Sequence, residues 1–165
     1  DVAFVFGKGL MVGTGGNHFA PALAATRGMA VRTLYSMENE PDVTGACPFA
    51  DVASGSYCED AVTWAAANGI VSGYSAAAFG PNDGITREQM ATVVARYLTA
   101  LGRAPGGAAQ TAYKDQSRIS AWALDGVALC TQEGILQGSN GAFLPKGKLT
   151  RAQTAAIVYR LSEME

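Results

Sequence analysis

The chain has 165 residues, of which 48% are hydrophobic, and this length allows one sizeable core or several small helical ones. Only 16% of the residues are charged, the net charge is −2, and no run of Lys and Arg could follow a phosphate backbone, so no nucleic-acid partner is expected. No stretch approaches the roughly 18 apolar residues of a membrane-spanning helix, so no membrane insertion is expected.

The chain starts with Asp1-Val2-Ala3-Phe4, which has neither an initiator methionine nor the charged-then-apolar layout of a signal peptide. We therefore interpret the sequence as a fragment whose export signal lies upstream or was removed. The place of the protein in the cell has to be inferred from its other features.

One pattern recurs along the chain with a period of about 60 to 65 residues and divides it into three copies. The first copy spans residues 1–42 and lacks the opening half of the pattern. Apolar residues at Ala30, Leu34 and Met37 have helical spacing, which predicts a helix after Thr26. The shared pieces of this copy are Gly9-Leu10-Met11-Val12-Gly13, Phe19-Ala20-Pro21 and Ala25-Thr26-Arg27-Gly28-Met29.

The second copy, residues 43–106, shows the complete pattern. Its Ala-rich segment 57–68 stops at Gly69, a residue type expected just past a helix end, which predicts a first helix. The apolar residues that follow Thr86 predict a second, amphipathic helix, and the Gly-rich stretch between is too short for more than a loop. The shared pieces are Phe49-Ala50-Asp51-Val52, Gly69-Ile70-Val71-Ser72-Gly73, Phe79-Gly80-Pro81 and Ile85-Thr86-Arg87-Glu88-Gln89.

The third copy, residues 107–165, repeats the second piece by piece. Segments 38–46 and 102–112 are rich in Gly, Pro, Ala and small polar residues and read as linkers between the copies. The expected fold is all-α, with three helix-loop-helix repeats that pack on one another. The shared pieces here are Tyr113-Lys114-Asp115, Gly134-Ile135-Leu136-Gln137-Gly138, Phe143-Leu144-Pro145 and Leu149-Thr150-Arg151-Ala152-Gln153.

Thr86-x-x-Gln89 and Thr150-x-x-Gln153 have the form of a capping box at the start of a helix. An arginine follows the threonine in all three copies, where its charge faces the positive end of the helix macrodipole at a cost on the order of a few tenths of a kcal/mol. Either an internal carboxylate or an anionic ligand held jointly by guanidinium and helix N–H groups could offset this cost. The residues alone leave both alternatives open.

This succession of motifs resembles the S-layer homology repeat, and the resemblance covers nearly the whole chain. It implies a pseudo-threefold helical bundle whose clefts bind secondary cell wall polymers, often pyruvylated, in the bacterial envelope. The expected function is therefore non-catalytic anchoring of an exported protein, outside the cell at the cell wall or S-layer, with a secondary cell wall polysaccharide as the partner.

The resemblance also implies which residues contact the ligand. The arginine of each Thr-Arg motif is expected to hold a carboxylate of the sugar, with help from the glutamine of the same motif, and glycines line the clefts. Met29 replaces the glutamine in the first copy, and Tyr113-Lys114-Asp115-Gln116 is a loosened form of Phe-x-Asp-Val. The expected ligand residues are Arg27, Arg87, Arg151, Gln89, Gln153, Gly13, Gly73 and Gly138.

Other residues are interpreted as structural. Cys47, Cys58 and Cys130 form no C-x-x-C pair and the chain has a single histidine, so neither a metal nor a cofactor is expected. Cys47 and Cys58 could pair in an oxidising compartment, but the odd number of cysteines favours free thiols. Asp51 and Asp115 precede helices, and we interpret them as capping or turn residues.

The alternative function is a structural or assembly module. Such a module would pack against a partner protein or a second copy of itself, with the arginines in salt bridges. A truncated first helix would leave apolar surface that could drive such self-association. An enzyme is not expected, because the sequence shows no catalytic arrangement of nucleophile, base and acid.

Overall fold

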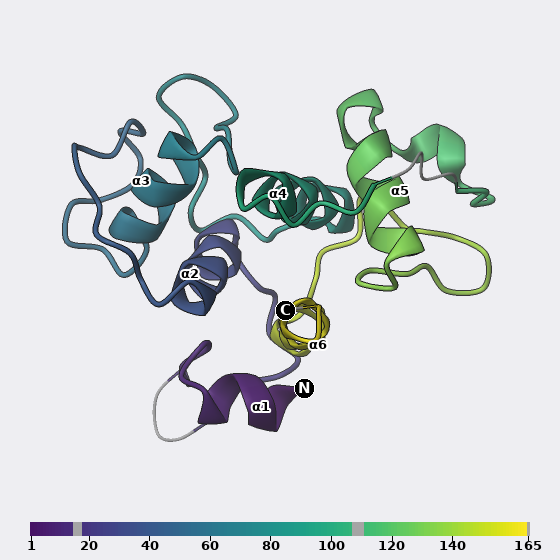
Figure 1. Cartoon of the computed structure of the whole chain (residues 1–165), viewed down its shortest axis with the longest axis horizontal. Helices are drawn as coiled ribbons and strands as arrows, with labels where there is room; N and C mark the ends of the chain where they lie inside the picture. The colour runs from purple at the N-terminus through teal and green to yellow at the C-terminus, as the bar shows by residue number, and fades with distance from the viewer. Residues whose placement is uncertain (15–17, 107–110, 165) are drawn as a thin grey trace. The chain divides into compact units, whose positions relative to one another are not determined.

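The protein is described here by a computed structural model, which covers residues 1–14, 18–106 and 111–164. The described residues form helices joined by loops, with isolated β-bridges and no longer strand, which confirms the all-α expectation (Figure 1). The helices are α1 (Val2–Gly7), α2 (Arg27–Met37), α3 (Glu59–Ala67), α4 (Arg87–Ala100) and α5 (Leu124–Gln132). Two short 3-10 helices, η1 (Gln116–Arg118) and η2 (Ala121–Ala123), precede α5, and α6 (Arg151–Ser162) ends the chain.

The chain divides into two compact units, residues 1–85 with 149–165, and residues 86–148. These units cut across the repeats expected from the sequence, because α6 belongs to the third copy but to the first unit. The repeat boundaries and the pseudo-threefold bundle stay predictions.

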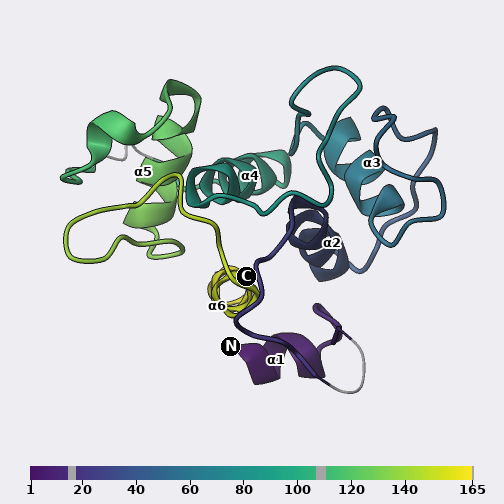
Figure 2. The same cartoon turned by 180° about the vertical axis from the view of Figure 1, so that it is seen from behind.

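In the first unit, α2 packs on α3 and α1 packs on α6 (Figure 2). The ring of Tyr35 lies 5.5 Å from the ring of Trp64, which joins α2 to α3. Phe4 meets Tyr159 edge to face at 5.1 Å and joins α1 to α6. A small core beneath this contact consists of Val5, Met11, Ala155 and Val158.

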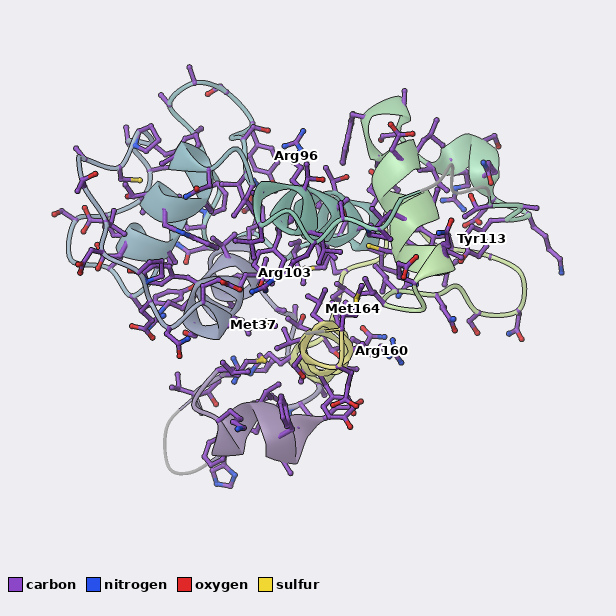
Figure 3. The ribbon with its side chains drawn as sticks, in the orientation of Figure 1. Met37, Arg96, Arg103, Tyr113, Arg160 and Met164 are labelled. Atoms are coloured by element: carbon purple, nitrogen blue, oxygen red, sulfur yellow. The ribbon has the colours of Figure 1, made fainter. Side chains whose placement is uncertain are left out.

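In the second unit, α5 crosses α4 at close range because Gly126 presents no side chain there. A Cβ atom on Gly126 would lie 2.9 Å from the carbonyl oxygen of Ala91 and 2.9 Å from the Cα of Thr92. Tyr113 lies beside α5, and its hydroxyl is 2.9 Å from that of Thr131 (Figure 3). The second unit is therefore built on one tightly packed helix pair.

Candidate functional site

The three helices that begin at an arginine are capped in the same way. Each threonine before the arginine accepts a hydrogen bond from the N–H three residues on, and in α4 and α6 the glutamine side chain returns the bond. The capping boxes predicted at Gln89 and Gln153 are thereby confirmed, with 3.0 and 2.9 Å from Thr86 N and Thr150 N to the glutamine oxygens. The role of both glutamines as ligand contacts stays a prediction.

The first two N–H groups of each of these helices donate to carbonyl groups in the loop that contains the Phe-x-Pro motif of another copy. Arg27 N donates to the Asp83 carbonyl at 2.8 Å, and Gly28 N donates to the Pro81 carbonyl at 2.9 Å. The starts of α4 and α6 repeat this arrangement, so the helix N–H groups are not available for a ligand. The expected share of the helix N–H groups in holding an anion is therefore wrong, and anion binding by the guanidinium groups stays a prediction. The corresponding acceptors are Gly147 and Pro145 for α4, and Leu23 and Pro21 for α6.

Each arginine side chain contacts the same loop as the backbone at the start of its helix. The Nε atom donates to the carbonyl of the Phe-x-Pro phenylalanine, Nη2 donates to a carbonyl in the preceding Gly-rich turn, and the guanidinium lies over the phenylalanine ring. For Arg27 these partners are Phe79 O at 2.9 Å, Ser72 O at 3.3 Å and the Phe79 ring at 4.5 Å. For Arg87 they are Phe143 O, Gln137 O and the Phe143 ring, and for Arg151 they are Phe19 O, Val12 O and the Phe19 ring.

The second alternative, an internal carboxylate, is not found at these sites. Among the described residues, the side-chain hydrogen bonds of the three guanidinium groups end on carbonyl oxygens and on one thioether, and none of the three forms an ion pair with Asp or Glu. Burial lowers the pKa of Arg27, Arg87 and Arg151 from its ordinary value. Their positive charges are thus held in place without a neutralising carboxylate in direct contact.

The three guanidinium groups differ in exposure. Arg27 and Arg151 are buried, at 7% and 4% exposure, and Arg87 is half-buried. At Arg151, Nη1 contacts the sulfur of Met29 at 3.6 Å, a weak acceptor.

A cavity of about 280 Å³ adjoins Arg151. One wall is the segment 9–12 of the first copy, and the other includes Met29 and Arg32 of α2 together with Tyr57. The cavity therefore combines two arginines with an apolar wall. The incomplete first copy still contributes to a concave site at its contact with α6.

The three glycines expected to line clefts are required by their own loops. A Cβ on Gly73 would lie 2.5 Å from the Ser75 carbonyl and would overlap the Ala78 carbonyl, and one on Gly138 would lie 2.5 Å from the Tyr113 ring. On Gly13 a Cβ would stand 3.0 Å from the His18 carbonyl. Close approach explains each glycine, and contact with a ligand stays a prediction.

Asp51 and Asp115 do not cap helices, which corrects the interpretation from sequence. The two carboxylate oxygens of Asp51 accept from Phe79 N at 2.8 Å and Gly80 N at 2.7 Å. Asp115 accepts from Phe143 N and Leu144 N in the same way. Each aspartate thus fixes the loop whose phenylalanine supports an arginine. The signal in the sequence was the equal spacing of 28 residues between aspartate and phenylalanine in both copies.

The family model of the S-layer homology domain matches residues 48–91 and 112–155. This chain belongs to the S-layer homology domain family. The resemblance stated from the motifs is confirmed, and the matched ranges contain Arg87 and Arg151 but not Arg27.

Relatives of this S-layer homology chain include both enzymes and surface proteins. An amylopullulanase of Thermoanaerobacterium thermosulfurigenes is 37% identical over 149 residues, which are 88% of this chain and 8% of that protein. A surface-layer 125 kDa protein of Lysinibacillus sphaericus is 27% identical, over 94% of this chain and 13% of the relative. A cellulosome-anchoring protein of Acetivibrio thermocellus is 26% identical, over 90% of this chain and 34% of the relative. The chain therefore spans only a small part of these proteins.

Membership of the S-layer homology family indicates a place at the cell surface, which confirms the expected localisation. It also implies cell-surface anchoring as the broad function, since the family occurs in surface-layer and anchoring proteins. None of the helices in the described ranges has the length and apolar character that a bilayer span requires.

Proposed function

We propose that this S-layer homology chain is a non-catalytic anchoring module that binds an anionic, pyruvylated secondary cell wall polysaccharide. The observation that carries the proposal is the common placement of Arg27, Arg87 and Arg151, each fixed by Nε and Nη2 while its charge has no carboxylate partner. A guanidinium held in this way loses little side-chain freedom when a carboxylate binds, which favours affinity.

The proposed contact of the carboxylate with each guanidinium is at Nη1. At Arg151 a carboxylate would displace the thioether of Met29. Hydrogen bonds between charged partners are stronger than those to a thioether, so the exchange is favourable. Gln89, Gln153 and the glycines Gly13, Gly73 and Gly138 complete the proposed sites. The repeated pairing of helix start and loop also supports the pseudo-threefold bundle as part of this proposal.

A pull-down with purified cell-wall sacculi tests the anchoring proposal. The chain is incubated with intact sacculi and with sacculi from which the secondary polymer has been removed chemically, and the bound fraction is measured. We expect binding to intact sacculi and loss of binding after the polymer is removed. Equal binding to the stripped peptidoglycan, or binding to neither, would overturn the proposal.

A structural assembly module is the second candidate, and two exposed apolar side chains favour it. Trp122 in η2 is 55% exposed, and Leu124, the first residue of α5, is 38% exposed. A pair of this kind can bind a second copy of the chain or another protein. Sedimentation of the wild type and of Trp122→Ala over a range of concentrations tests this. If the chain self-associates through these side chains, the variant should have a lower average molecular mass than the wild type.

A further inference from the structure

The Arg27 site differs from the other two by a second aromatic ring. The centre of the Arg27 guanidinium lies 4.5 Å from the ring centroid of Phe79 and 4.6 Å from that of Tyr74, so two aromatic rings contact it. Within the described ranges, Arg87 and Arg151 each have one ring in this role. Tyr74 therefore distinguishes the Arg27 site from the otherwise similar sites at Arg87 and Arg151.

The loop hydrogen bonds show which residues correspond to Tyr74. Tyr74 N donates at 2.7 Å to the carbonyl of Ala78, the residue before the Phe-x-Pro motif. Thr14 and Ser139 donate from the same loop position to the residues that precede Phe19 and Phe143. The first and third copies thus carry a small polar residue where the second carries an aromatic one.

A second residue of the second copy makes room for the ring. Gly80 has a φ of +73°, and a Cβ placed on it would lie only 2.5 Å from Cε2 of Tyr74. The corresponding residues Ala20 and Leu144 also have positive φ, at 50° and 59°, but both carry a side chain. The backbone conformation is therefore shared, and the absence of a side chain at Gly80 is what lets the ring of Tyr74 lie against the loop.

Tyr74 is held from one side and open on the other. Its inner face packs on the Arg27 guanidinium, while the residue as a whole remains 56% exposed. The guanidinium beneath this ring is buried, since Arg27 as a whole is 7% exposed. A sugar whose carboxylate met the edge of this guanidinium would have its ring beside an aromatic side chain that is already in position.

We propose that Tyr74 is a specificity-determining residue of the Arg27 site, where its outer face stacks against the sugar ring that carries the bound carboxylate. Aromatic side chains offer large contact areas at low cost in conformational entropy, and packing on Arg27 and Gly80 lowers this cost further. The Arg87 and Arg151 sites then recognise the carboxylate with less regard to the sugar. This inference rests on the proposed binding of an anionic polysaccharide.

The test compares a ligand that has a sugar ring with one that has only the carboxylate. Binding of a pyruvylated disaccharide and of free pyruvate is followed by NMR at the backbone N–H of Phe79, whose carbonyl accepts from Arg27, in the wild type, Arg27→Lys, Tyr74→Ser, Tyr74→Phe and Gly80→Ala. We expect Tyr74→Ser to weaken disaccharide binding about fivefold while pyruvate binding stays within about twofold, and Tyr74→Phe to behave as the wild type. Gly80→Ala displaces the ring without removing it and should weaken disaccharide binding in the same direction.

Outcomes for the two proposals are distinguishable. If the disaccharide binds the wild type, is lost in Arg27→Lys, and binds Tyr74→Ser with unchanged affinity, the role of Tyr74 is overturned and the anchoring proposal stands. Equal weakening of disaccharide and pyruvate by Tyr74→Ser would show that the ring only positions Arg27, which also overturns the inference. If the disaccharide fails to bind the wild type, or binds Arg27→Lys equally well, the carboxylate site at Arg27 fails and the inference with it. Melting curves of each variant exclude loss of the fold as the cause.

Discussion

Asp51 fixes the loop on which Arg27 rests, and its charge makes this contact sensitive to pH. Hydrogen bonds from the N–H groups of Phe79 and Gly80 lower the pKa of Asp51 below its ordinary value of 3.8. Because the folded pKa is the lower one, the stabilisation is present above the unfolded pKa and is lost as the pH falls through the folded pKa. Removal of the charge should therefore flatten the dependence of stability on acid pH.

Asp51→Asn tests this link between charge and stability. We expect the variant to melt at a lower temperature than the wild type at neutral pH, and the difference to shrink between about pH 6 and about pH 2.5, as measured by circular dichroism. Asp42→Asn is a suitable control, because Asp42 is exposed and lies in the linker after α2. A constant difference between Asp51→Asn and wild type over this range would contradict the assigned role.

Cys130 is a second residue whose chemistry follows from burial. It is fully buried on α5, and burial raises the pKa of its thiol to about 12, so the reactive thiolate is rare at neutral pH. All three cysteines are free, which agrees with the interpretation from their odd number, and Cys47 is only half-buried. With a thiol reagent at about pH 8, we expect Cys47 to react first and Cys130 to react only after denaturation. Rapid modification of Cys130 in the folded protein, identified by mass spectrometry, would contradict this placement.

The position of the arginines could be predicted from the sequence, but their partners could not. Recurrence of Arg27, Arg87 and Arg151 after a threonine was visible, and so was the conflict with the helix macrodipole. The groups that resolve the conflict are backbone carbonyls such as Phe79 O and Ser72 O. Every residue carries a carbonyl, so no side-chain pattern marks an acceptor of this kind.

At the scale of elements, the packing of α4 on α5 depends on Gly126. Gly126→Ala would place a methyl group against the backbone of Ala91 and Thr92, and overpacking of this kind costs about 1–3 kcal/mol. We expect the free energy of unfolding to fall by about 2 kcal/mol in urea denaturation. Gly106→Ala is the matched control, because a Cβ on Gly106 meets nothing within 4 Å. Equal stability of the two variants would mean that α5 does not approach α4 as closely as described.

The helices that follow a capping box were predicted to begin where they do, because Thr86 and Thr150 mark their first turns. The region before α5 was less predictable. Two short 3-10 helices separate Asp115 from α5, and neither has a capping side chain or an apolar period to mark it. The loop contacts of Asp51 and Asp115 were missed for another reason, since they join residues far apart in sequence.

At the scale of the whole molecule, membership of the S-layer homology family is established and the ligand is proposed. The S-layer homology match covers two ranges of the chain, and the relatives that share it are much longer proteins of different kinds. Membership of the family implies cell-surface anchoring for the region that these relatives share with the chain. We propose that the three arginines supply the chemistry of this anchoring.

The most direct test of this account measures stability and polymer binding together in arginine variants. Arg87→Ala and Arg151→Ala should weaken binding to purified polymer-bearing sacculi severalfold or abolish it, and each should also lower the free energy of unfolding by about 2 kcal/mol through lost hydrogen bonds. Arg118→Ala, which removes an exposed arginine from η1, serves as the control of equal charge. Variants that are destabilised yet bind the sacculi like the wild type would contradict the account, because the arginines would then serve the fold alone.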